Sequence, residues 1–280
     1  MRQDIVHSGA PLFGKFEHGA LELLRFQEPG LIVDVGAAAG YVTKWMLHFS
    51  PGSRARCFEP FPGNWKYIDD VLGKDKRAEI RREAVSSSKG TMSFHVESVV
   101  PEGQRFSGYS SLGKLVDGSP KGSVQVPVTT LDDQISEAVR FLKIDVQDGE
   151  LNVLRGATET LERGVDVAFV EFGGEIDLLD FLMERFVVFD HRYHIRPYVE
   201  GASLSSWKDL QSFQLSTGHS AFHGWPDEHL SDPKAFANFF RDERKRGVTV
   251  YTDLVCIRPG ATEALLAKAS AYTQLTASSM

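Results

Sequence analysis

The stretch LIVDVGAAAGYVTKWMLHF, Leu31 to Phe49, decides the fold of this chain, together with RCFEPFP at Arg56 to Pro62. The first stretch predicts an apolar strand, a turn of small residues and a helix. The second predicts another strand with an acid, Glu59, directly after it. This order is typical of a unit that binds an adenosine-bearing cofactor at the carboxyl edge of a parallel sheet.

The turn between the first strand and the helix distinguishes between two such cofactors. A dinucleotide fingerprint requires Gly at position 38 and Gly or Ala at position 41, whereas this chain has Ala38 and Tyr41. The glycine that lets a pyrophosphate approach the backbone is therefore missing. Glu59 is still placed to accept hydrogen bonds from a ribose diol. The pattern favours S-adenosylmethionine over NAD.

Composition sets the outer limits on function. The chain has 280 residues, 42% of them hydrophobic, which is ample for a buried core. The net charge of −7 argues against wide nucleic-acid contact, which needs many cations. Neither end carries a long apolar run, so no signal peptide or membrane span is expected. Cys57 and Cys256 lie in strand-like runs and are predicted to be buried free thiols, which indicates a reducing cytoplasm.

Strands and helices alternate along the first two thirds of the chain, which predicts a doubly wound α/β sheet. The predicted strands are 31–35, 55–58, 80–85, 91–97, 124–128, 140–146, 165–172, 186–189 and a late strand at 248–258. The predicted helices are 16–27, 43–49, 65–72 with Asn64 as its cap, a short helix from Thr130 to Ile135, 149–163 and 176–185. The sheet is expected to be mostly parallel, with the late strand antiparallel.

The domain organisation follows from the same reading. Residues 1–29 are expected to form a helical cover, and residues 30–280 the catalytic domain. Two segments, 98–122 and 190–246, are rich in loop-forming residues. Loops of this length are usually functional or disordered. We expect both segments to be insertions that bind the acceptor substrate.

An ordered set of short motifs resembles the FkbM-type family of S-adenosylmethionine-dependent methyltransferases. The motifs are D-V-G-A-x-x-G at 34–40, F-E-P-x-P at 58–62, V-x-T-L-D at 128–132, L-K-I-D-V at 142–146, Glu150, V-L-x-G-A at 153–157 and V-E-F at 170–172. The resemblance covers residues 30 to 175. It implies a Rossmann-like class I methyltransferase fold and, for many members, methylation of hydroxyl groups on sugars or secondary metabolites.

Two positions depart from the family pattern. The family commonly has Asn where this chain has Ala38, which removes a side-chain contact near the methionine portion of the cofactor. The family usually continues Asp-Val-Glu-Gly after the fourth strand, whereas this chain has Asp145, Val146, Gln147 and Asp148. The charge pattern just past that strand is therefore altered.

The cofactor site is expected at the strand ends. Glu59 is the predicted ribose ligand, the turn glycines are predicted to face the cofactor through their backbone, and the end of the third strand is predicted to lie against adenine. Asp145 is predicted to bind the methionine amine or to act directly in catalysis. The expected cofactor-binding residues are Asp34, Gly36, Ala37, Gly40, Glu59, Pro60, Ala84, Val85 and Asp145.

Catalysis and acceptor binding are assigned to polar residues at the same edge. Lys143 and Asp145 alternate along one strand and share a face, where they form either a buried ion pair or a catalytic pair. The candidate general bases are His191, His194, His219 and His223, of which His191 and His194, directly after the sixth strand, are preferred. The expected acceptor-binding residues are Tyr109, Ser110, Glu171, His194 and His223. The sequence has no compact spacing of histidines and carboxylates that is typical of a metal site, so no metal is expected.

The sequence therefore predicts a methyltransferase that transfers a methyl group from S-adenosylmethionine to a hydroxyl of a sugar, glycan precursor or glycosylated metabolite. The expected partner is a small-molecule or carbohydrate acceptor. Neither nucleic acid nor a membrane is expected as a partner, and the sequence leaves open whether the protein forms a homo-oligomer. One alternative is an NAD-dependent sugar-modifying enzyme, against which the missing glycine and the absence of a Tyr-x-x-x-Lys pair argue. The other is a cofactor-binding scaffold without catalysis.

Overall fold

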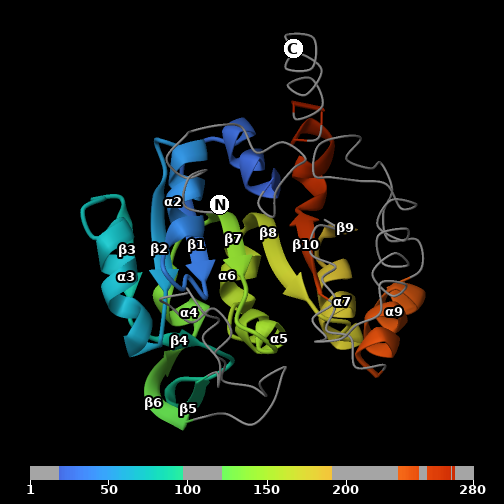
Figure 1. The fold of residues 1–280 in the computed structure, drawn as a ribbon. Coiled ribbons are helices and arrows are strands. Elements are labelled where there is room, and N and C mark those ends of the chain that lie inside the picture. Colours follow the sequence, from blue (N-terminus) through green and yellow to red (C-terminus); the bar gives the residue numbers. More distant parts are fainter. Residues whose placement is uncertain (1–18, 97–121, 191–232, 246–250, 266, 269–280) are drawn as a thin grey trace, which may run out of the picture. The chain divides into compact units, whose positions relative to one another are not determined.

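A seven-stranded sheet organises the protein, and its strands come from the segments that the sequence predicted (Figure 1). The computed structural model describes residues 19–96, 122–190, 233–245, 251–265 and 267–268. The sheet order is β3-β2-β1-β7-β8-β10-β9. Its strands are β1 (Leu31–Val35), β2 (Arg54–Phe58), β3 (Ala78–Arg81), β7 (Val139–Ile144), β8 (Val165–Phe172), β9 (Val187–Asp190) and β10 (Thr252–Ile257).

Strand direction follows the expectation for a doubly wound sheet with one late reversal. Strand β1 pairs in parallel with β2 and with β7, and β2 pairs in parallel with β3. Strand β10 runs antiparallel to β9. Every residue of β1 is buried, which explains why its sequence is a continuous apolar run broken only by Asp34. The predicted fold class, an α/β class I methyltransferase sheet, is confirmed.

The described residues divide into two compact units, and β8 passes from one to the other. The first unit holds residues 27–168, and the second holds residues 19–26 and the chain from residue 169 onward. The helices of the first unit are α2 (Tyr41–Phe49), α3 (Pro62–Leu72), α4 (Leu131–Gln134), α5 (Glu150–Arg155) and α6 (Thr158–Arg163). Helix α2 connects β1 to β2, α3 connects β2 to β3, α4 precedes β7, and α5 and α6 connect β7 to β8.

A second, three-stranded sheet in the first unit has the order β4-β6-β5. Its strands are β4 (Ala84–Val85), β5 (Gly90–Val96) and β6 (Gly122–Thr129), and β5 pairs antiparallel with β6. The expectation of one strand over residues 80–85 was wrong. Strand β3 ends at Arg81, and Ala84 begins a strand that pairs with β6 because its side chain joins a buried cluster with Phe94 and Val126.

Helix α3 begins earlier than the sequence indicated. Asn64 is not its cap but a buried residue inside the helix, and the capping position is Phe61. Pro62 occupies the first helical position, where a missing N–H costs nothing because that group has no partner within the helix. The early start places the first turn of α3 directly after Glu59.

The expected helix over residues 149–163 is two helices, α5 and α6, separated at Gly156 and Ala157. A Cβ atom on Gly156 would lie 2.1 Å from the carbonyl oxygen of Ser86, so the chain needs glycine here. Helix α6 has its own cap, because the Asp132 carboxylate accepts hydrogen bonds from the backbone N–H groups of Glu159 (3.1 Å) and Thr160 (2.7 Å). These contacts stop the two helices from merging.

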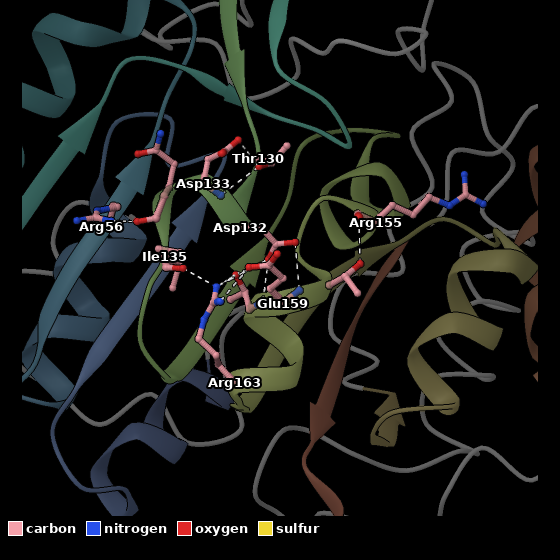
Figure 2. Close-up of polar contacts among 11 residues, drawn as sticks. Arg56, Thr130, Asp132, Asp133, Ile135, Arg155, Glu159 and Arg163 are labelled. Carbon is pink, nitrogen blue, oxygen red and sulfur yellow. Dashed lines mark hydrogen bonds and ion pairs between the residues drawn. The ribbon is translucent and has the colours of Figure 1, made fainter.

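The corner between α4 and α6 is held by charged and capping groups (Figure 2). Thr130 caps α4 as predicted, because its hydroxyl accepts a hydrogen bond from the N–H of Asp133 at 3.2 Å. Figure 2 shows Asp132 facing Glu159 and Arg163, and the Arg163 guanidinium donates to the carbonyl of Ile135 at 2.5 Å. The corner fixes the chain that leads from β6 into β7.

The second unit contains η1 (Gly19–Phe26), a 3₁₀-helix, with α7 (Ile176–Met183) and α9 (Pro233–Lys245). The segment 16–27 was expected to be helical, and its described part is. The sequence did not reveal α9, which lies inside the stretch interpreted as loop-rich. Its Phe236 and Phe240 have ring centroids 5.5 and 5.4 Å from that of Phe172. The spacing of four residues between these two phenylalanines was the sequence signal that could have predicted the helix.

Among the described helices, none combines the length and the apolar character that a membrane crossing needs.

Candidate cofactor site

Three parallel strands end side by side at one edge of the sheet. In the pairing register, Val35 of β1 lies opposite Phe58 of β2 and Ile144 of β7. The next residues along these strands are Gly36, Glu59 and Asp145. The glycine turn therefore lies between the two carboxylate-bearing strand ends, at the position where doubly wound sheets bind their ligands.

The turn after β1 needs glycine for two separate reasons. Gly36 has φ +82° and Gly40 has φ +81°, a left-handed conformation that side chains disfavour. A Cβ on Gly36 would also lie 1.8 Å from the carbonyl oxygen of Asp145. Ala38 adopts φ +47°, so the position where the family commonly has Asn is itself left-handed. Asn tolerates this conformation better than Ala does.

Glu59 is buried, with 4% of its surface exposed, and its carboxylate is held by backbone donors. The N–H of Ala38 donates to Oε2 at 2.8 Å, and the N–H of Phe61 donates to Oε1 at 2.9 Å. Burial raises the pKa of Glu59 to about 7, although these donors, the Asn64 side chain and the Lys143 charge act in the opposite direction. With these two N–H groups and the Asn64 side chain as donors, the carboxylate keeps about one acceptor position for a further hydrogen bond.

Lys143 lies at the centre of a buried charged network. Its Nζ donates to the carbonyl oxygen of Gly36 at 2.7 Å and lies 3.3 Å from Oδ1 of Asp34 and 3.4 Å from Oδ2 of Asp145. Thr43 on α2 donates to the other oxygen of Asp34 at 2.6 Å. Lys143 and Asp145 share one face, as the sequence predicted, and lie at ion-pair distance; their roles toward cofactor and acceptor stay predictions. Sequence analysis missed Thr43. The available signal was a hydroxyl side chain in the first turn of the helix that follows the glycine turn.

Asp145 is the more exposed end of this network, with 38% of its side chain accessible. Its Oδ1 accepts a hydrogen bond from the Gln147 amide at 2.9 Å. Gln147 and Asp148 have φ +60° and +74°, so two residues in succession are left-handed. The family pattern has glycine at position 148, where such a backbone costs least. The departure from Asp-Val-Glu-Gly therefore gives Asp145 a donor and adds strain to the loop.

The remaining predicted cofactor ligands have mixed surroundings. Ala37 packs its side chain into a core cluster with Cys57 and Ile68, and its N–H donates to the carbonyl of Phe58 at 3.0 Å. Pro60 is buried beside Glu59. Ala84 and Val85 are buried in β4 of the small sheet, not at the end of β3. The two residues do follow β3 in the chain, as predicted, but they belong to the separate strand β4.

The acceptor side of the site falls largely beyond the described residues. Tyr109, Ser110, His191, His194 and His223 lie outside them. Glu171 is half-buried on β8 in the second unit. The described residues contain no group of three His, Cys, Asp or Glu side chains arranged to hold a metal ion.

The residues present suit the cofactor that the sequence predicted. A bare turn backed by the Asp145 carbonyl leaves no room for a side chain at Gly36, and the buried Glu59 carboxylate lies on one side of that turn. A partly exposed carboxylate lies on the other side. A ribose diol and an ammonium group are the complementary partners of these two acids.

Comparison with known proteins agrees with this description. The model of the methyltransferase FkbM domain matches residues 34–195, which is more than half of the chain. One similar solved structure is the methyltransferase FkbM from Methylobacillus flagellatus KT, with 16% identity and a TM-score of 0.38 over 82% of this chain and 44% of that chain. Another is precorrin-6y C5,15-methyltransferase from Geobacter metallireducens GS-15, with 17% identity and a TM-score of 0.36 over 61% of this chain and 72% of that chain. No curated protein matches the sequence.

The fold and the family model together define a class I methyltransferase. The chain belongs to the FkbM methyltransferase family, whose members use S-adenosylmethionine as the methyl donor. The alternative of an NAD-dependent enzyme is thereby removed. The chain spans less than half the length of the Methylobacillus structure.

Proposed function

We propose that the protein transfers a methyl group from S-adenosylmethionine to a hydroxyl of a sugar, a glycan precursor or a glycosylated metabolite. The observation that carries the cofactor half of this proposal is the placement of Glu59 and Asp145 at the ends of β2 and β7, on either side of the Gly36 turn. The acceptor half rests on the family resemblance and on the charge of −7, which disfavours nucleic acid.

Each acid has one role in this proposal. Glu59 accepts a hydrogen bond from the ribose diol, and Asp145 faces the methionine ammonium. The bound cofactor supplies an electrophilic methyl group. The protein then contributes mainly by holding the acceptor oxygen in line with that methyl group, which accounts for the largest share of acceleration in such displacements. A base that removes the hydroxyl proton adds about 10²–10⁴-fold.

Acceptor choice is assigned to residues 98–122 and 190–246, most of which lie outside the described residues. We propose His191 or His194 as the proton acceptor, and Tyr109, Ser110, Glu171 and His223 as acceptor ligands. Residues 1–29 would cover the catalytic domain. A reducing, cytoplasmic location is consistent with Cys57 and Cys256, which are both free and buried.

Calorimetry and an acceptor panel test the two halves separately. Titration with S-adenosylhomocysteine should give saturable 1:1 binding, and Glu59→Gln should weaken it at least tenfold. Undetectable binding would refute the cofactor half. Transfer of a labelled methyl group to a panel of free sugars, nucleotide sugars and glycosides should label a hydroxyl. Labelling only of amines or carbon atoms in a matched panel would refute O-methylation but leave methyl transfer intact.

A further inference from the structure

The Lys143 ammonium is enclosed by acceptor groups of the protein. The side chain is 6% exposed, and three acceptors lie within 3.4 Å of Nζ: one in β1, one in the turn after β1 and one directly after β7. One of the three N–H donors of the ammonium is hydrogen-bonded to the Gly36 carbonyl, and the carboxylates of Asp34 and Asp145 lie at ion-pair distance. With these three groups around a side chain that is 6% exposed, little of Nζ is open to an acceptor hydroxyl.

Proton transfer by this amine is also disfavoured. Burial opposes the charge of Lys143, but the carboxylates of Asp145 and Asp34 outweigh burial and raise the pKa of the ammonium above its ordinary range. Lys143 therefore stays protonated across the physiological range and cannot serve as a base. Its charge is balanced locally by two acids that have no other cation within the described network.

The three contacts join elements that the cofactor would touch. One ends on the carbonyl of the glycine turn after β1, another on the carboxylate that follows β7, and the third on an acid inside β1. Gln147 completes the hold on Asp145 by donating to its second oxygen at 2.9 Å. Both oxygens of Asp145 are thus fixed in direction while part of the side chain stays open to solvent.

We propose that Lys143 is a positioning residue, which locks the Gly36 turn and the Asp145 carboxylate into the geometry that receives the cofactor and does not act on the acceptor hydroxyl. This inference rests on the proposed function, because it assigns Asp145 and the turn to the cofactor. It revises the expectation that Lys143 belongs to the catalytic group.

The test combines cofactor affinity with the stability of the ligand-free protein. Lys143→Met keeps the length of the side chain and removes its charge, and Asp145→Asn removes the partner charge. Both variants and their combination are compared by S-adenosylhomocysteine calorimetry and by urea denaturation. Lys89→Met is the matched control, because Lys89 also pairs with an aspartate, Asp133, at 3.0 Å but is 66% exposed.

We expect Lys143→Met to weaken S-adenosylhomocysteine binding by at least about tenfold. Combining it with Asp145→Asn should cost less than the sum of the two single losses, since both changes break the same Lys143–Asp145 contact, although Asp145→Asn also removes the charge that faces the ammonium. Lys89→Met should bind like the parent protein. A double-mutant cycle of the unfolding free energies, measured on the ligand-free proteins, should show the same coupling between Lys143 and Asp145.

Two results would overturn the inference. Unchanged S-adenosylhomocysteine affinity with lost methyl transfer would assign Lys143 to the acceptor, and additive losses in both measurements would remove the coupling. If Lys143→Met does not fold, Lys143→Gln retains a donor for the Gly36 carbonyl and is measured in its place. Absence of binding by the parent protein would refute the proposed function, whereas the stability cycle would still report whether Lys143 and Asp145 are coupled.

Discussion

The backbone N–H of Ala38 donates a hydrogen bond of 2.8 Å to the carboxylate of Glu59, and this contact joins the turn after β1 to the end of β2. The two residues are 21 positions apart and belong to different motifs of the family pattern. The turn proposed to receive the cofactor and the acid proposed to bind its ribose are therefore one structural unit. Disturbing either residue should affect the other.

The protonation of Glu59 should make cofactor affinity depend on pH. Burial raises the pKa of this carboxyl to about 7, above its ordinary value of 4.5, and ribose hydroxyls are bound best by the ionised form. Affinity for S-adenosylhomocysteine should thus rise as the pH increases from 6 to 8, by about tenfold per pH unit below the pKa. Calorimetry at several pH values measures this dependence.

Stability should change in the opposite direction over the same range. Because the folded-state pKa is the higher one, the folded protein binds the proton more tightly. This contribution to stability is full below pH 4.5 and is lost as the pH rises through 7, at a cost of about 3 kcal/mol. Urea denaturation of the parent and of Glu59→Gln isolates the effect. Identical pH profiles of the two proteins would show that Glu59 is not the titrating group.

The left-handed conformation of Ala38 should be open to improvement. Ala38→Gly removes the strain of φ +47°, and Ala38→Asn relieves part of it while restoring the side chain that is common in the family. Each variant should have a free energy of unfolding about 0.5–1 kcal/mol higher than that of the parent protein. Urea denaturation measures this gain.

Comparison of these two variants isolates the side-chain contact. Only Ala38→Asn should bind S-adenosylhomocysteine more tightly than the parent, if the amide reaches the methionine portion. Equal affinity of the two variants would show that the family favours Asn at this position for its backbone conformation alone.

Gly36→Ala should be far more damaging than an alanine at another glycine with positive φ. A Cβ at position 36 would lie 1.8 Å from the Asp145 carbonyl oxygen, whereas Gly164 has φ +119° and nothing within 4 Å of its Cβ position. We expect Gly164→Ala to cost about 1 kcal/mol through conformational strain alone. Gly36→Ala should cost more than about 3 kcal/mol and abolish S-adenosylhomocysteine binding. Similar losses in urea denaturation would mean that β7 can move away from the turn.

Asp132→Ala should destabilise the fold through α6. The carboxylate accepts hydrogen bonds from two backbone N–H groups at the start of this helix, so its loss should cost about 1–2 kcal/mol in urea denaturation (Figure 2). Asp133→Ala is the matched control, because within the described part of the chain the neighbouring carboxylate accepts hydrogen bonds from the side chains of Thr130 and Lys89 at the surface. Its loss should cost less than about 0.5 kcal/mol. A control loss as large as that of Asp132→Ala would contradict the capping role.

The sequence determined the features that depend on local pattern. Continuous apolar runs located β1 and β8 to the residue, because strands buried on both faces need apolar side chains throughout. The positions of Gly36 and Glu59 at strand ends followed from those runs. The placement of Lys143 and Asp145 on one face followed from the alternation of side chains along a strand.

Tertiary structure decided the features that depend on contacts between distant segments. The separation of β4 from β3, the break at Gly156 and the enclosure of Lys143 each arise from a partner that lies far along the chain: β6, the carbonyl of Ser86, and the turn at Gly36. Local periodicity holds no information about such partners. The role of a lysine in a strand, as a catalyst or as a fixed support, is set by how many acceptors surround its nitrogen, and only the folded chain brings those acceptors together.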